Sequence, residues 1–116
     1  MATTRTRSRG RYLTLTPTDG WALSNDPGVC GQIFGIALTN KDPVLGTTSV
    51  DTLGVYTCSV KGIDQSGNSA VAAGDIIYYT AADTPKLSKK NTGVYAGKAL
   101  GILGSGSTGN IDVRLG

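Results

Sequence analysis

Few residues in this chain could do chemistry. The 116 residues include no histidine and no glutamate, so the usual partners for general acid–base catalysis and for histidine-containing zinc sites are missing. The aspartates stand singly among turns, and none has the spacing of a calcium loop. Cys30 and Cys58 are the only cysteines and have no companions with which to hold a metal. We therefore expect no catalytic residue, no metal and no cofactor, and hence no enzyme.

Three weaker signals for chemistry remain. The segment 93–99, GVYAGKA, has a Gly-Lys step, but it is one spacer residue short of a phosphate loop and ends in alanine. The glycine-rich segment 104–109 precedes an expected strand, whereas an anion cradle requires a helix N-terminus. Neither segment predicts nucleotide binding. A pairing of Ser88 with Lys89 or Lys90 stays open, although neighbours in a loop are weak evidence for a nucleophile.

Positive charge is concentrated at the start of the chain. The first eleven residues contain no acid and four arginines, Arg5, Arg7, Arg9 and Arg11. We predict that residues 1–11 form a flexible basic arm before a single β domain at residues 12–116. The arm lacks the apolar core of a secretory signal, and no later segment has transmembrane length. The arm could neutralise nucleic-acid phosphates, order on an acidic protein surface or remain a solvated tail.

The composition favours short strands over helices. Seventeen glycines and the absence of glutamate are typical of strands joined by tight turns. The clearest signal is at 55–61, where Tyr56, Cys58 and Val60 alternate with polar residues. Cys58 is therefore expected on the buried side, and we expect both cysteines to be reduced. Further strands are expected at 12–16, 29–38, 47–53, 94–103 and 111–115, with Gly31 and Gly35 interrupting the second.

We expect the other elements to be organised around a strand at 76–79, IIYY. Gly74 and Asp75 before it predict a tight turn. The unbroken apolar run suits a central strand that is covered on both faces, by a second sheet or by a neighbouring subunit. The loop at 81–91 is expected to be a solvated charged face or, alternatively, a partner contact. It contains three lysines, Lys86, Lys89 and Lys90.

The order of these signals along residues 12–116 resembles a family of small phage head proteins. These are the decoration, or capsid cement, proteins, which phage genomes often mislabel as recombinase-associated. The order and spacing of the segments are specific, above all the Gly-Asp step followed by an aliphatic-aromatic strand. The matching segments are VCGQIFGIA at 29–37, GTTSV at 46–50, GVY at 54–56, AVAAGDIIY at 70–78, GKAL at 97–100 and IDVRL at 111–115.

The resemblance implies a small β-barrel-like domain of the β-tulip kind, usually a homotrimer, on the outside of an icosahedral head. Such proteins lie where capsomers meet and stiffen the shell against the pressure of packaged DNA. The implied partners are further copies of the chain and the major capsid protein, and the implied location is the virion exterior, after assembly in the host cytoplasm. The short N-terminal segment that is usual in this family is less basic. A capsid contact by Arg5, Arg7, Arg9 and Arg11 is therefore our own inference.

For contacts between subunits we predict four large aromatic residues. They are Trp21, Tyr56, Tyr78 and Tyr79, each of which could instead be buried in the core of one chain. Two other functions stay open: a nucleic-acid-binding accessory protein that acts through the arm, and a tail or fibre module that binds the host surface. Salt-sensitive DNA binding that requires residues 1–11 would favour the first, and a solvent-exposed Trp21 would favour the second.

Overall fold

The computed structural model describes residues 12–116, so the expected basic arm and its arginines, Arg5, Arg7, Arg9 and Arg11, lie outside the described residues. Every regular element of the described part is a strand, which confirms the all-β prediction. None of these residues belongs to a helix long and apolar enough to cross a membrane. The strands are β1 (Tyr12–Leu15), β2 (Asp19–Gly20), β3 (Pro27–Cys30), β4 (Ile33–Ala37), β5 (Thr48–Asp51), β6 (Gly54–Lys61), β7 (Ile63–Asp64), β8 (Gly67–Asn68), β9 (Ile76–Tyr79), β10 (Leu87–Ser88), β11 (Val94–Ala99) and β12 (Thr108–Leu115).

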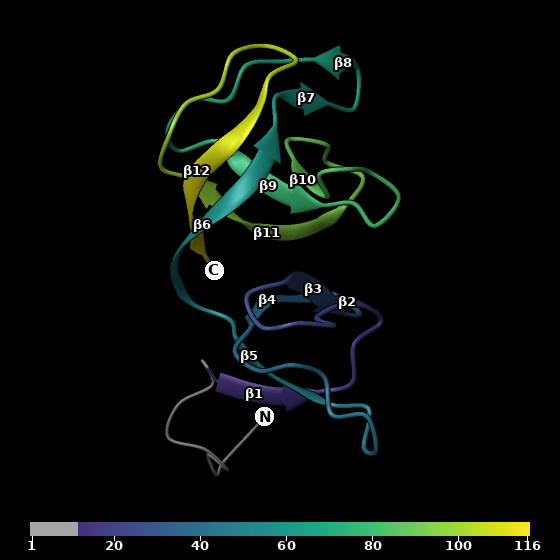
Figure 1. Cartoon of the computed structure of the whole chain (residues 1–116). Coiled ribbons are helices and arrows are strands. Elements are labelled where there is room, and N and C mark those ends of the chain that lie inside the picture. Colours follow the sequence, from purple (N-terminus) through teal and green to yellow (C-terminus); the bar gives the residue numbers. More distant parts are fainter. Residues whose placement is uncertain (1–11) are drawn as a thin grey trace, which may run out of the picture.

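The strands form two main bodies, which lie one above the other in Figure 1. The N-terminal sheet has the strand order β1-β5-β4-β3-β2 and is antiparallel throughout. Five later strands close into a barrel in the order β10-β6-β12-β11-β9, and β7 and β8 form a small separate hairpin. The closed barrel agrees with the β-barrel-like domain that the family resemblance implies.

Trp21 directly follows the edge strand β2, and its side chain fills the core of the N-terminal sheet. Its side chain is fully buried in a cluster with Ala37 and Val50. The indole Nε1 donates a 2.8 Å hydrogen bond to the carbonyl oxygen of Gly35. A Cβ on Gly28 would lie 2.8 Å from the indole ring, so glycine at this position makes room for it. The alternative in which Trp21 fills the core is confirmed.

The single strand expected at 29–38 is wrong, because two antiparallel strands, β3 and β4, occupy this region. They are joined at Gly31, whose φ of 60° lies in the left-handed region that glycine adopts easily. Gly35, the second expected interruption, lies inside β4 opposite Gly28. A Cβ on Gly35 would lie 3.0 Å from the carbonyl oxygen of Asp51, so this glycine permits close packing against β5.

β6 and β12 are the longest strands and pair along their whole length. On β6, Cys58 and Val60 are buried and Tyr56 is half-buried on the same side. This confirms the alternation predicted from the sequence. Cys30 and Cys58 are both free thiols, as expected.

β9 is the expected aliphatic-aromatic strand, and the turn before it contains Gly74 with a φ of 91°. Both edges of β9 are paired, one with β10 and the other with β11. Ile77 and Tyr79 point into the core, but Ile76 is 41% exposed and Tyr78 is half-buried. The expectation that both faces are covered is therefore wrong within one chain, because strands of a closed barrel alternate between interior and exterior.

β10 was not expected from the sequence. Leu87 and Ser88 lie within the segment that was predicted to be an open loop, and both are buried. They pair in parallel with β6 and antiparallel with β9, and these two pairings close the barrel.

The two bodies share their main core. Val29, Phe34 and Ile36 of the N-terminal sheet belong to the same buried cluster as the interior side chains of the barrel. The ring of Phe34 lies against that of Tyr79, with 5.9 Å between the ring centroids. The β3–β4 hairpin therefore packs against the lower end of the barrel (Figure 1).

Candidate docking surfaces

Tyr79 ties the barrel to the N-terminal sheet. Its side chain is buried, and its hydroxyl donates a hydrogen bond to the carboxylate of Asp19 on β2. The same carboxylate accepts a 2.8 Å hydrogen bond from Nζ of Lys86, which lies 5.6 Å from the centroid of the Tyr79 ring. We call Tyr79, Asp19 and Lys86 the latch. Tyr79 is thus occupied within its own chain and is not available to a neighbouring subunit.

The charges of the latch support one another. The hydrogen bond from Lys86 lowers the pKa of Asp19, and the hydrogen bond from Tyr79 lowers it to a smaller extent, although burial opposes both. The hydrogen bond to Asp19 raises the pKa of Lys86. Burial, followed by the hydrogen bond to Asp19, raises the pKa of Tyr79 to about 12. At neutral pH the carboxylate and the ammonium are therefore charged and the phenol is protonated, as these contacts require.

Tyr56 makes a similar contact at the connection between β5 and β6. Its hydroxyl donates to the carboxylate of Asp51, the last residue of β5. The other oxygen of that buried carboxylate accepts a 3.2 Å hydrogen bond from the backbone N–H of Leu53. Tyr56 thus joins the barrel to the N-terminal sheet where the chain passes from one to the other. Three of the four predicted contact residues, Trp21, Tyr56 and Tyr79, therefore make contacts inside the chain.

Tyr78 is the fourth predicted contact residue, and it lies on the outside of the barrel. Its ring packs edge-on against that of Tyr95 on the neighbouring strand β11, with 6.4 Å between centroids and 86° between the planes. Tyr95 is 40% exposed, and its hydroxyl donates a 3.0 Å hydrogen bond to the backbone oxygen of Gly116. A partly exposed tyrosine pair is amphipathic, as residues in protein interfaces often are.

Two cations lie side by side next to this tyrosine pair. Lys98 on β11 is directly opposite Arg114 on β12, and on its other side it is opposite Ile76 on β9. Both cations are exposed, and within residues 12–116 neither has an ion-pair partner. Like charges directly opposite one another destabilise a sheet, so this pair favours an acidic partner surface. We call Ile76, Tyr78, Tyr95, Lys98 and Arg114 the barrel face.

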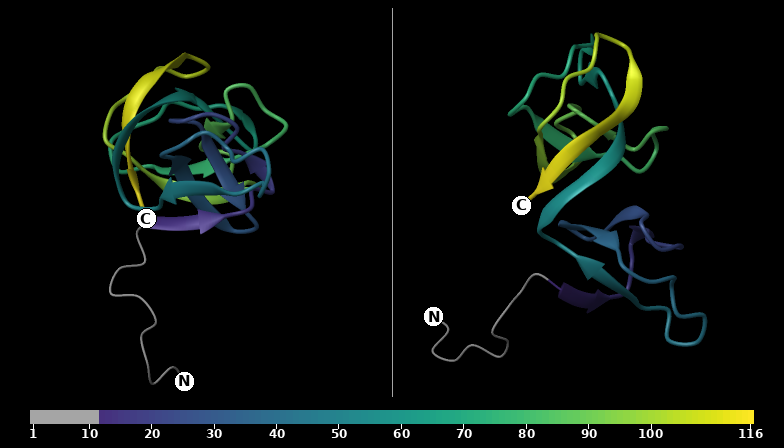
Figure 2. Two further views of the ribbon diagram at one scale, coloured as in Figure 1. Left: turned by 60° about the horizontal axis from the view of Figure 1, so that its bottom comes forward. Right: turned by 60° about the vertical axis from the view of Figure 1, so that its left-hand side comes forward.

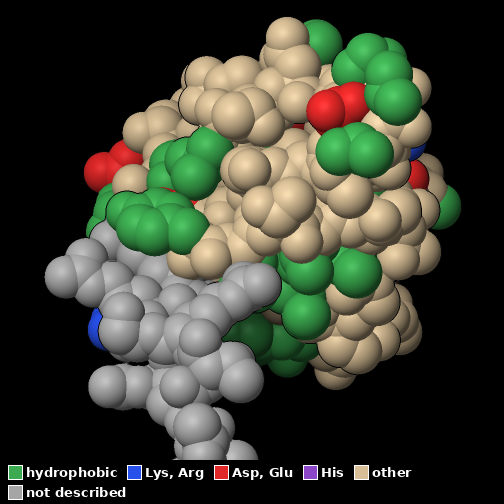
Figure 3. Space-filling model, turned by 90° about the horizontal axis from the view of Figure 1, so that it is seen from below, with side chains coloured by type: hydrophobic (Ala, Val, Ile, Leu, Met, Phe, Trp, Pro, Cys, Tyr) green, Lys and Arg blue, Asp and Glu red, His purple; other side chains and the backbone are tan. Residues whose placement is uncertain are grey.

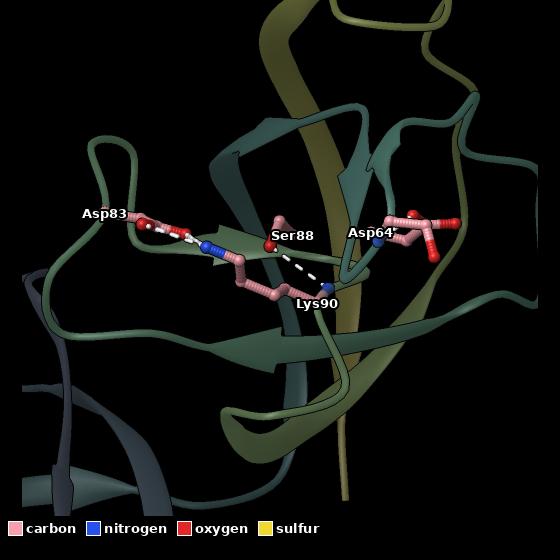
Figure 4. A network of polar contacts seen from close by, with 5 residues as sticks. Asp64, Asp83, Ser88 and Lys90 are labelled. Atoms are coloured by element: carbon pink, nitrogen blue, oxygen red, sulfur yellow. Dashed lines mark hydrogen bonds and ion pairs between the residues drawn. The ribbon is translucent and has the colours of Figure 1, made fainter.

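The lysines beside β10 are each paired with an aspartate of the same chain. Nζ of Lys90 lies 3.0 Å and 3.3 Å from the two carboxylate oxygens of Asp83 (Figure 4). Nζ of Lys89 lies 3.3 Å from the carboxylate of Asp75, and Lys86 belongs to the latch. The expectation of an open solvated face was wrong, because β10 holds this segment against the barrel, where each lysine reaches an aspartate of the same chain. The alternative of a partner contact stays a prediction.

A hollow of about 450 Å³ lies beside Lys89. Its charged lining groups already have partners, since Asp75 and Lys89 pair and the carboxylate of Asp64 accepts a 2.8 Å hydrogen bond from the backbone of Ser66. No group of three or more potential metal ligands occurs in the described part of the chain. The hollow therefore gives no indication of a ligand.

A second exposed surface lies on the loop between β4 and β5. Val44 is 89% exposed, more than any other large hydrophobic residue described, and Leu45 is 73% exposed. The loop projects from the N-terminal sheet, at the end away from the barrel (Figures 1 and 2). Seen from below, the molecule shows several separate groups of hydrophobic side chains with few charges between them (Figure 3).

The backbone at this loop is a single capped turn. The carboxylate of Asp42 accepts hydrogen bonds of 2.8 Å and 3.0 Å from the backbone N–H groups of Val44 and Leu45. Both bonds lower the pKa of Asp42, and the bond from Leu45 has the larger effect. Gly46 ends the turn with a φ of 71°, and its N–H donates to the carbonyl oxygen of Asp42 at 2.8 Å. We call residues 42–46 the capped turn.

Sequence reasoning treated the capped turn only as a loop and missed it as a surface. The signal was nevertheless present. An aspartate followed by proline is typical of the start of a helical turn, and a glycine is typical of the residue just after its end. Asp42, Pro43 and Gly46 occupy these positions.

One family model matches almost the whole chain. The model, described as "Phage cement protein", covers residues 7–115 and therefore includes both the N-terminal sheet and the barrel. Comparison with curated proteins found no match, and comparison with solved structures found none either.

Proposed function

Because the chain belongs to the phage cement protein family, and is therefore a structural capsid protein and not an enzyme, we propose that it binds the outside of the assembled shell as a homotrimer. In this proposal the trimer, built from domains of the β-tulip kind, stabilises the shell against the pressure of packaged DNA. The observation that carries the proposal is the family match over residues 7–115.

The proposed mechanism is mass action strengthened by avidity. A trimer presents each docking contact three times, so after the first contact forms, the second and third form at a high effective concentration. A ligand that binds only one state of a protein stabilises that state. A trimer that binds only the assembled shell therefore opposes its disassembly.

The barrel face is the surface we propose for contact between copies. Tyr78 and Tyr95 form an amphipathic pair. Tyrosine and arginine are enriched among the interface residues that contribute most of the binding energy. For contact with the shell we propose the arginines that precede β1, which would meet acidic patches on capsid subunits. These are Arg5, Arg7, Arg9 and Arg11.

The proposal is tested with heads purified from a phage strain that lacks the gene for this chain. We expect added chain to sediment with these heads and to raise the temperature at which they release DNA. Light scattering of the chain alone should give a mass three times that of one chain. Removal of residues 1–11 should weaken head binding and its dependence on salt. A chain that stays monomeric and does not sediment with the heads would contradict the proposal.

A further inference from the structure

The capped turn places two adjacent aliphatic side chains in solvent. Single exposed hydrophobic residues are ordinary on protein surfaces. Val44 and Leu45 differ because they are neighbours, are 89% and 73% exposed, and lie on a loop that projects from the sheet. No side chain of residues 12–116 covers these two residues, and a contact with another molecule would remove them from water.

The loop is held in one conformation before any contact is made. Besides the cap at Asp42, the backbone N–H of Asp42 donates to the carbonyl oxygen of Thr47 at 2.8 Å. The base of the loop is tied to the segment before β3. The N–H of Lys41 donates to the carbonyl oxygen of Ala22 at 3.1 Å, and the side chain of Asn40 accepts a 2.8 Å hydrogen bond from Ser24. A preorganised loop loses little conformational entropy on binding, which favours its use as a contact.

The size of this surface decides which kind of partner it suits. A stable interface between two proteins buries about 800 Å² on each partner. Two aliphatic side chains on one turn offer far less, so they cannot hold two copies of the chain together in solution. They can contribute where other contacts already hold the chain in place, as on a shell. The turn also lies away from the barrel face, so both surfaces can be occupied at once (Figure 1).

We propose that the capped turn is a docking knob that inserts Val44 and Leu45 into an apolar recess of a capsid subunit. This inference rests on the proposed function. It names Val44 and Leu45 as residues that contact the shell. In the bound state the two side chains leave water, and the hydrogen bonds of Asp42 keep them aimed at the recess.

The test measures binding of labelled chain to heads from the deletion strain. The Val44→Ser/Leu45→Ser double variant should bind about 100-fold more weakly, because full burial of one such side chain is worth about tenfold or more in affinity. Its fold, judged by circular dichroism, and its oligomeric mass should match those of the wild type. The matched control is Ile102→Ser, which removes a 75% exposed aliphatic residue beyond β11 and should leave binding unchanged.

Variants at Asp42 test the role of the cap separately from the apolar side chains. Asp42→Ala keeps both aliphatic residues but frees the turn, and we expect a loss of binding smaller than that of the double variant. Asp42→Asn retains a good capping side chain and should bind like the wild type.

The outcomes separate this inference from the proposed function. If the wild type binds heads and the Val44→Ser/Leu45→Ser variant binds equally well, the inference is wrong and the proposed function stands. If the double variant loses its oligomeric mass, the turn contacts another copy of the chain, and the inference is wrong. If the wild type itself does not bind heads, both are wrong.

Discussion

Replacement of Tyr79 by phenylalanine tests whether the latch holds the two bodies together. The variant removes one hydroxyl from a buried side chain and leaves the ion pair between Asp19 and Lys86 in place. A hydrogen bond to a charged group contributes about 1.5–3 kcal/mol. The Asp19 side chain is 36% exposed, so water can replace the phenol as a donor and the lower end of this range applies. We expect the free energy of unfolding to fall by about 1.5 kcal/mol.

This change is large enough to measure by heat or by denaturant. At about 2.1 cal/mol/K per residue, the entropy of unfolding of this chain is about 0.24 kcal/mol/K, so Tm should fall by about 6 °C. Urea unfolding followed by Trp21 fluorescence reports on the N-terminal sheet, and circular dichroism reports on the whole chain. If residues 12–116 form one cooperative domain, both signals should change at the same urea concentration.

The matched control for this prediction is Tyr95→Phe. The hydroxyl of Tyr95 bonds to the backbone oxygen of Gly116, and both residues are exposed. Its loss should lower the free energy of unfolding by only about 0.5 kcal/mol, because water can replace the partner of an exposed hydrogen bond. A Tyr79→Phe variant no less stable than this control would refute the idea that the latch contributes to stability. Two separate transitions in the wild type would refute the single cooperative domain.

Three further predictions follow from the structure. Stability should fall as pH rises from 10 to 12, because Tyr79 ionises near 10 when unfolded but at about 12 when folded, and pH-dependent Tm measurements would show this. Burial, with a smaller contribution from the nearby carboxylate of Asp112, raises the pKa of Cys58 to about 11. At pH 8 a thiol reagent should therefore modify Cys58 only as fast as the chain unfolds. Faster modification would contradict the burial of this thiol. Gly97→Ala should lower the free energy of unfolding in urea by about 2–3 kcal/mol, because its Cβ would lie 2.1 Å from a backbone carbonyl oxygen of β12. In the control Gly31→Ala the new Cβ meets no neighbouring atom. This control should lose only about 1 kcal/mol, because alanine disfavours the left-handed φ at this position.

The elements that could be predicted from the sequence are those with a local pattern. The alternation of Tyr56, Cys58 and Val60 defines both the strand β6 and its buried side, since a strand repeats every two residues. The turn at Gly74 and Asp75 is likewise local, because glycine there adopts a positive φ and the carboxylate of Asp75 accepts a 2.8 Å hydrogen bond from the backbone of Ala72.

The elements that were missed depend on contacts between distant parts of the chain. Leu87 and Ser88 carry no periodic pattern, and they form a strand only because β6 and β9 lie on either side of them. The lysines around them looked solvated because their aspartate partners are not adjacent in sequence. The latch is the clearest case, since Asp19 lies 60 residues from Tyr79 and 67 residues from Lys86. Such a constellation is defined only by the folded chain.

The joint between the two bodies has a mechanical consequence for a capsid protein. If the proposed contacts form, a subunit held at the capped turn and at the barrel face would be pulled along the direction that separates its sheet from its barrel when the shell is strained. The latch, the contact between Tyr56 and Asp51 and the shared core all cross that joint, so a force in this direction would load all three. Forced unfolding is governed by the rate of unfolding, not by equilibrium stability. Under the proposed function, the lifetime of this joint under tension would therefore limit how long each subunit could restrain the shell.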